Sequence, residues 1–123
     1  MDKTEHFVQE LKRDLIDNEL HRSIKQLVLT HPNSIVANEN HKKFVEIYQD
    51  LVATGDNVVI DEYIEQCVVD TISMLLAGID GTFDIGSISD GLELSLDGEI
   101  ISGSLREEFQ YVVESVQSRK QLD

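Results

Sequence analysis

Residues 60–76 read IDEYIEQCVVDTISMLL, and this stretch decides the fold that we expect. Its apolar residues recur in steps of three and one, which is the spacing of one face of an amphipathic α-helix. That face carries Ile60, Tyr63, Ile64, Cys67, Val68, Thr71, Ile72, Leu75 and Leu76. Met74 widens the stripe, and Gly78 is a natural stop for a helix. We therefore predict a central helix over residues 60–77 that buries this stripe, Cys67 included, in the core.

Upstream of the central helix, the apolar stripe of residues 4–29 changes face. At about 100° per residue, one side carries Phe7, Val8, Leu11 and Leu15, and roughly the opposite side carries Ile16, Leu20, Ile24, Leu27 and Val28. Either two helices meet near Asp17 and Asn18, with Asn18 capping the second, or one helix is buried on two sides. We favour two helices, or one sharp bend.

Two further helices have clear end signals. Asn38 or Asn40 can cap the first, and Gly55 suits its C-terminal end. The second opens with Ser104-Leu105-Arg106-Glu107, in which the serine and the glutamate form a capping box. We expect these helices to pack through two stripes, one of Phe44, Tyr48, Leu51 and Val52 and one of Leu105, Phe109, Val112, Val113 and Val116.

Between the central helix and the last one, the apolar pattern changes from a helical period to a period of two. Leu92, Leu94 and Leu96 alternate with polar residues, and Asp97-Gly98 then leads into two isoleucines. An Asp-Gly pair between such runs indicates a hairpin, because a type I′ turn needs positive φ at both positions. We predict a β-hairpin over residues 91–102 whose leucine face packs on helices.

Together these elements predict a mainly α (α+β) fold. Four to five helices should gather around the central amphipathic helix (60–77), and the small β-hairpin (91–102) should precede the C-terminal helix. A chain of 123 residues matches the size of one domain, so we expect a single α-rich domain over residues 1–123.

The sequence lacks the signals of an exported or membrane-spanning protein. Its start, MDKTEHFVQELKRD, is charged and has no apolar h-region, and no stretch approaches the roughly 18 apolar residues of a membrane span. Cys67 is the only cysteine, which excludes an internal disulfide bond. We therefore expect a cytoplasmic protein.

Negative charge is concentrated in the second half of the chain. The net charge is −14, of which residues 1–53 contribute −2 and residues 54–123 contribute −12. Between Lys43 and Arg106 there is no lysine, arginine or histidine. Such a field repels nucleic acid and anionic membranes, and it speeds encounter with a basic protein. The alternative is that the acidity serves solubility alone.

No pattern in the sequence indicates catalysis, a cofactor or a metal site. The histidines lack the i, i+4 spacing that places two ligands on one helical face. A calcium loop that starts at Asp80 would need glycine and glutamate where the chain has Ile85 and Gly91. Carboxylate pairs such as Asp61 and Glu65 arise by chance in a chain with 24 acidic residues. We therefore expect no enzyme, no cofactor and no bound metal.

One constellation of residues does indicate recognition of a partner. On the outer side of the central helix, Val69 projects between Glu62, Glu65, Gln66, Asp70 and Ser73. An apolar residue ringed by acids resembles an interface anchor with a charged rim; the alternative is that Val69 belongs to the core. We expect the acidic partner-binding surface to continue around the hairpin through Asp80, Asp84, Asp90, Glu93, Asp97 and Glu99.

In size, acidity and lack of a catalytic motif, the chain resembles small acidic bacterial toxin-immunity proteins of the contact-dependent-inhibition type. The resemblance covers no defined motif, so it assigns no residue a role. It implies an inhibitor that neutralises a basic, nuclease-type toxin by occluding its cationic surface. The alternative is a non-catalytic regulatory or adaptor helical domain that binds another protein through an apolar groove.

Overall fold

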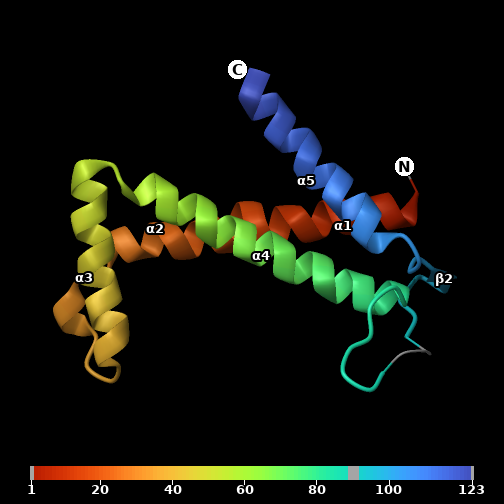
Figure 1. The fold of residues 1–123 in the computed structure, drawn as a ribbon, viewed down its shortest axis with the longest axis horizontal. Coiled ribbons are helices and arrows are strands. Elements are labelled where there is room, and N and C mark those ends of the chain that lie inside the picture. The colour runs from red at the N-terminus through yellow and green to blue at the C-terminus, as the bar shows by residue number, and fades with distance from the viewer. Residues whose placement is uncertain (1, 89–91, 123) are drawn as a thin grey trace.

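Helices dominate the structure, and a small hairpin precedes the last of them (Figure 1). A computed structural model describes residues 2–88 and 92–122, with side chains as far as Ser115. In chain order the elements are α1 (Lys3–Lys12), the π-helical segment η1 (Arg13–Leu20), α2 (His21–Leu29), the 3-10 turn η2 (Pro32–Ser34), α3 (Glu39–Thr54), α4 (Asn57–Asp80), β1 (Ser95–Leu96), β2 (Glu99–Ile100) and α5 (Leu105–Leu122). The predicted fold class is confirmed.

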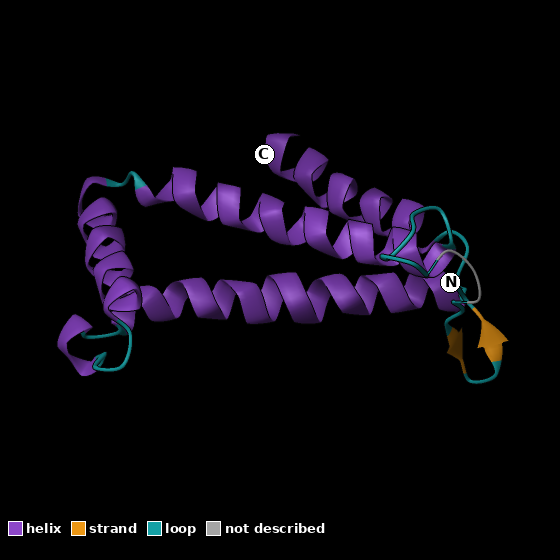
Figure 2. Ribbon diagram, turned by 60° about the horizontal axis from the view of Figure 1, so that its bottom comes forward, coloured by secondary structure: helices purple, strands orange, loops and turns teal. Residues whose placement is uncertain are grey.

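Two long helical rods lie side by side and run in opposite directions (Figure 2). One rod continues from α1 through η1 into α2, and the other is α4. Helix α3 crosses one end of the pair, and the hairpin lies at the other end. Helix α5 contacts both α1 and α4 close to the hairpin and then diverges from α4 (Figure 1).

The first rod is one continuous helix, so the prediction of two helices or a sharp bend is wrong. The residue before α2 is Leu20, whose φ of −64° and ψ of −48° are helical, and Asn18 caps nothing. The backbone of η1 makes wider turns than an α-helix, because each π-helical hydrogen bond spans five residues. The wider turn lets buried or half-buried positions recur every fourth residue, at Val8, Lys12, Ile16, Leu20 and Ile24.

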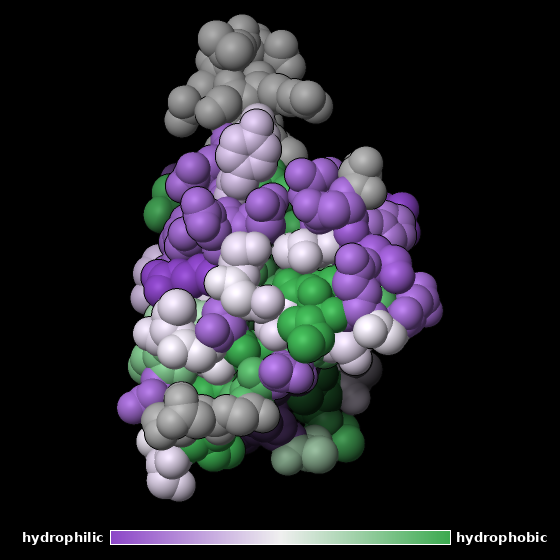
Figure 3. Space-filling view, turned by 90° about the vertical axis from the view of Figure 1, so that its right-hand side faces the viewer, coloured by the Kyte–Doolittle hydropathy of each residue, from purple (hydrophilic) through white to green (hydrophobic). Residues whose placement is uncertain are grey.

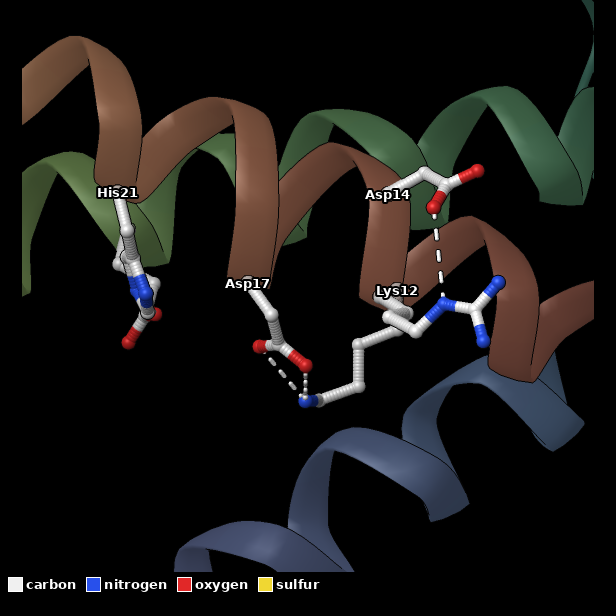
Figure 4. Close-up of polar contacts among 6 residues, drawn as sticks. Lys12, Asp14, Asp17 and His21 are labelled. Carbon is white, nitrogen blue, oxygen red and sulfur yellow. Dashed lines mark hydrogen bonds and ion pairs between the residues drawn. The ribbon is translucent and has the colours of Figure 1, made fainter.

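An ion pair accompanies the π-helical segment (Figure 4). Lys12 occupies one of the inward positions and is only 9% exposed. Its Nζ donates to both carboxylate oxygens of Asp17, at 2.9 and 2.8 Å. The two residues are five positions apart, a spacing that places side chains on one side of a π-helical turn but not of an α-helical one. The wide turn therefore supplies the partner that a buried ammonium group needs.

The main core lies at the hairpin end of the molecule. Val8, Leu105 and Phe109 are fully buried there, and Leu76 and Ile101 are nearly so. These residues come from α1, α4, α5 and the segment that follows β2. Figure 3 views the molecule from this end and shows apolar side chains lying between polar ones.

Helix α4 buries a face that is rotated from the one that the sequence predicted and shares Leu76 with it. Its buried residues are Val69, Ser73, Leu76, Ala77 and Gly78. Cys67 is exposed, so the prediction that it lies in the core is wrong. The reason is that η1 and α5 pack against α4 on the side of Val69, and no described element covers the side of Cys67. Val69 is 8% exposed and belongs to the core, which was the alternative to an exposed anchor.

Helix α4 also ends later than predicted. It runs through Gly78 to Asp80, and Gly81 then takes the left-handed conformation with φ of 82°. Gly78 instead lies inside the helix, where an added Cβ would collide with the side chain of Ile85. This glycine therefore allows the following loop to approach the helix closely.

The hairpin forms around the predicted turn. Strands β1 and β2 are antiparallel, with Ser95 opposite Ile100 and Leu96 opposite Glu99. Asp97 and Gly98 have φ of 53° and 81°, as a type I′ turn requires. The ladder is shorter than the predicted range of 91–102, and residue 91 lies outside the described residues. Leu94 and Leu96 pack against the main core.

The start of α5 takes its cap from a distant residue and not from the predicted capping box at Ser104. The carboxylate of Asp80, at the end of α4, accepts hydrogen bonds from the backbone N–H groups of Gly103 (2.6 Å), Leu105 (3.1 Å) and Arg106 (2.9 Å). The first N–H groups of a helix have no partner within it. A negative charge there also interacts favourably with the positive end of the helix dipole. Asp80 therefore ties the end of α4 to the start of α5.

Candidate partner-binding surface

The outward side of α4 is apolar and only partly covered, since Ile64, Val68 and Ile72 are half-buried and the last two also pack against the main core. We call it the open face of α4, and it consists of Tyr63, Ile64, Cys67, Val68, Thr71 and Ile72, with Val59 and Leu75 at its ends. The first six residues line a shallow depression of about 310 Å³. Tyr63 and Val59 are each 70% exposed and Leu75 is 56% exposed. Single exposed apolar side chains are ordinary, whereas a continuous row along one helix is typical of a binding surface.

Tyr63 and Cys67 lie one helical turn apart on the open face. The neighbouring Cys67 is the main cause that raises the pKa of Tyr63 above its usual value. The phenol therefore stays neutral at physiological pH. Its aromatic ring supplies apolar contact area and its hydroxyl supplies a polar end, a combination that is enriched at protein interfaces.

Acidic residues flank the open face along α4. Asp61 and Glu65 lie toward α2, and Asp70 lies toward α5. Helix α4 itself contains no lysine, arginine or histidine. The nearby basic side chains on the α2 side are His21 and Lys25. An apolar row between acidic flanks favours a partner that is apolar in the middle and basic at the edges.

Two of the predicted site residues, Glu62 and Glu65, turn toward α2. They line a cavity of about 410 Å³ between α2, α3 and α4. On one wall of this cavity, Nε2 of His21 lies 2.9 Å from Oε1 of Glu65. Figure 4 shows His21 projecting from the first rod. Glu65 therefore already has a partner within the molecule.

The cavity contains a buried polar contact between α3 and α4. Tyr48 is 2% exposed, and its hydroxyl donates to Oδ1 of Asp61 at 2.7 Å. Nδ2 of Asn57 donates to the other oxygen of the same carboxylate at 3.1 Å. Burial raises the pKa of Tyr48, and the hydrogen bond to Asp61 raises it further. Asp61 therefore joins the two helices.

Three other predicted residues, Gln66, Val69 and Asp70, face α5 instead. They line a small pocket between α4 and α5, to which α5 contributes Gln110 and Glu114. The structure thus divides the predicted α4 constellation between two sides of the helix. Gln110 and Glu114 were not predicted from the sequence, although they lie four positions apart and so share one face of their helix.

The acidic residues at the hairpin end have different surroundings. Asp80 caps α5, Glu99 lies 3.5 Å from Nζ of Lys3, and Asp97 forms the hairpin turn. Asp84 and Glu93 are exposed, and Asp90 lies outside the described residues. The structure therefore gives Asp80 and Asp97 local structural tasks, while Asp84 and Glu93 point to solvent.

Two absences among the described residues bear on the class of site. No group of three or more histidine, cysteine, aspartate or glutamate side chains among them could hold a metal ion. No helix in the described ranges combines the length and the apolar character needed to cross a membrane.

Comparison with known proteins identifies no relative. No family model, curated protein or solved structure matches the chain. The resemblance to immunity proteins stays a prediction.

Proposed function

We propose that this chain is a non-catalytic binding protein that holds a basic amphipathic helix of a partner protein on the open face of α4. The observation that carries the proposal is a row of exposed apolar side chains along a helix that contains acids but no basic residue. Apolar contacts would supply the affinity of such a complex, and the acidic flanks would select the partner and speed its association.

Charge argues for a partner of different sequence and against a second copy of this chain. Two copies docked through the open face would bring together two chains that each carry a net charge of −14. Like charges across an interface oppose association. A helix with lysine or arginine beside its apolar stripe would instead place a positive charge near the exposed Asp70 at the edge of the face.

Neutralisation of a basic nuclease-type toxin is one form of this function, and the acidity of the second half of the chain supports it. A regulatory or adaptor role is the other form, and the apolar character of the open face supports that one. The salt dependence of the association rate separates the two. Steering by charge makes association slow steeply as salt rises, whereas docking dominated by apolar contact changes little.

Fluorescence anisotropy with synthetic helical peptides tests the proposal. Three peptides of about 18 residues are compared, because that length spans about five helical turns. One is amphipathic and basic, one has the same composition in scrambled order, and one is amphipathic and acidic. We expect only the first to bind, and we expect its affinity to fall as the salt concentration rises.

Paired variants locate the binding surface. The double substitution Tyr63→Ser and Leu75→Ser changes two exposed residues of the open face and should abolish peptide binding. The matched control, Tyr111→Ser and Ile100→Ser, changes side chains that are 70% and 59% exposed elsewhere and should bind normally. Equal binding of the basic and scrambled peptides would overturn the proposal, as would a stable dimer in sedimentation that the Tyr63 and Leu75 variant dissociates.

A further inference from the structure

A second, polar site lies beside the open face, in the small pocket between α4 and α5. It has a volume of about 120 Å³. Its polar residues are Gln66, Asp70 and Ser73 of α4 and Gln110 and Glu114 of α5. Val69 and Val113, each 8% exposed, form its apolar floor. Figure 1 shows that α5 diverges from α4 beyond this region.

The hydroxyl of Ser73 marks the pocket as more than a surface depression. Ser73 is 4% exposed, and its Oγ has no hydrogen-bond partner among the described residues. A serine or threonine within a helix commonly donates to the carbonyl four residues earlier, as Thr71 does to Cys67 at 2.8 Å. Burial without a partner is costly, so such groups call for an explanation. A ligand group in the pocket would supply the missing partner.

The other polar groups of the pocket are mainly hydrogen-bond acceptors. Nε2 of Gln66 donates to Oδ1 of Asp70 at 2.8 Å, which leaves the Gln66 amide oxygen and Oδ2 of Asp70 as acceptors. Glu114 adds a second carboxylate from the facing helix. No lysine, arginine or histidine lines the pocket. Two negative charges therefore share a site with several acceptors and no internal cation.

We propose that this pocket binds a guanidinium group. A guanidinium presents five N–H donors in a planar fork that matches carboxylate oxygens on two sides. It is also weakly hydrated, which suits an apolar floor such as Val69 and Val113. An ammonium ion offers three donors and is strongly hydrated. Calcium ions take roughly six to eight oxygen ligands, and two carboxylates supply too few of them.

Two sources could supply the guanidinium. One is an arginine of the partner helix, and this form of the inference rests on the proposed function. The pocket and the open face share helix α4, and Asp70 lies on the flank between them. The other source is a free small molecule that carries a guanidinium group. The chemistry at Asp70, Ser73 and Glu114 is the same in both.

Titration of the isolated protein with ethylguanidinium chloride tests the site without any partner. The readout is the ¹H–¹⁵N NMR shifts of the side-chain amides of Gln66 and Gln110 and of the nearby backbone. Ethylammonium chloride at the same ionic strength is the control ligand. We expect saturable shifts with ethylguanidinium, a dissociation constant on the order of millimolar for so small a ligand, and much smaller shifts with ethylammonium.

Three variants assign the binding to this pocket. Asp70→Asn should weaken ethylguanidinium binding about tenfold, since a charged acceptor becomes neutral. Its matched control, Asp50→Asn, removes the same charge from an exposed position on α3 and should leave binding unchanged. Ser73→Ala should weaken binding about threefold while it raises the thermal midpoint of the ligand-free protein, because it removes a buried hydroxyl without a partner.

Several results would overturn the guanidinium site. They are equal shifts from ethylammonium, equal weakening by Asp50→Asn and Asp70→Asn, or an unchanged affinity in Ser73→Ala. The source of the guanidinium is identified by comparing two forms of the basic peptide, one with arginine and one with lysine at the basic positions. A preference for arginine that Asp70→Asn removes identifies a partner side chain, and equal binding of both peptides identifies a small molecule. If no peptide binds while ethylguanidinium does, the proposed function fails and the pocket stands.

Discussion

At the hairpin end of the molecule, Val8, Leu105 and Phe109 are completely buried, whereas at the α3 end Ile47 is 58% exposed and Val59 is 70% exposed. Both ends are built from amphipathic helices. The difference is that α5 covers the rods at the hairpin end, and no described element covers the outward side of α4 toward α3. An apolar stripe therefore shows that a helix has a face to bury, but not whether this chain buries it.

Polar contacts join the helices of the α3 end, beside the buried side chains of Val45 and Tyr48. Nε2 of Gln49 donates to the carbonyl oxygens of Thr30 at 2.6 Å and of Leu27 at 2.9 Å. Tyr48 donates to Asp61 across α3 and α4. Such contacts help to fix the positions of the helices without covering exposed apolar side chains such as Ile47 and Val59.

The largest expected effect contrasts the core with the open face. Phe109→Ala should lower the free energy of unfolding by about 3–5 kcal/mol, because it leaves a cavity in the packed end. Tyr63→Ser on the open face should change it by less than about 0.5 kcal/mol. Urea unfolding followed by circular dichroism measures both. Comparable losses in the two variants would mean that the open face is packed in solution.

The next effect concerns the link between α4 and α5. Asp80→Ala should lower the free energy of unfolding by about 2 kcal/mol, at the upper end of measured helix-cap losses, because several N–H groups lose one acceptor. Asp84→Ala, an exposed acid in the following loop, should cost less than about 0.5 kcal/mol. The same urea experiment decides the matter, and equal effects would show that Asp80 acts through charge alone.

A smaller effect tests the polar contacts of the α3 end. Tyr48→Phe removes the hydroxyl that donates to Asp61. It should lower the free energy of unfolding by about 1 kcal/mol, a typical value for one buried hydrogen bond. Tyr111 is 70% exposed, so Tyr111→Phe should be neutral. Thermal unfolding of both variants gives the comparison. A neutral Tyr48→Phe would assign the stability of this end to apolar packing.

The smallest effect depends on pH and lies at the packed end. Partial burial raises the pKa of Glu108, and the charges of Glu5, Asp2 and Glu107 raise it further. The folded chain therefore holds this proton more tightly than the unfolded chain, so the ionised carboxylate is penalised above the folded pKa. Glu108→Gln should raise the free energy of unfolding by about 0.3 kcal/mol at pH 7 and leave it unchanged in acid.

A control and a pH series complete that test. Glu46 is exposed on α3, away from the acids that surround Glu108, so Glu46→Gln should show no such difference between pH 7 and acid. Chemical unfolding at several pH values gives the difference for each variant. If the stabilisation by Glu108→Gln grew toward acid, the pKa of Glu108 would be lowered in the folded chain and not raised.

The sequence predicted those parts of the fold that depend on local chemistry. The Asp97-Gly98 turn, the cap at Asn38 and the end of α3 at Gly55 all lie where the residue types require them. The N-terminal rod was mispredicted because an analysis at a fixed helical period cannot represent a change of period. The π-helical turn and the ion pair of Lys12 with Asp17 absorb the shift between the two apolar stripes.

The candidate surface was harder to predict, because it depends on which helices pack together. The periodicity of α4 was read correctly, but the side that α5 covers is set by tertiary contacts between residues far apart in the sequence. Val69 and Cys67 consequently exchanged roles, the first buried and the second exposed. Glu114 belongs to the pocket only because α5 lies beside α4, and no local pattern could pair it with Asp70.

The distant cap provided by Asp80 also has a kinetic consequence. The first turn of α5 gains its acceptor only after the chain between residues 81 and 102 has closed on the end of α4, and the entropic cost of closure rises slowly with loop length. Individual helices form within about a microsecond, but this contact requires two of them to meet. The last turn of α4 and the first turn of α5 should therefore become ordered together, as a single late step of folding.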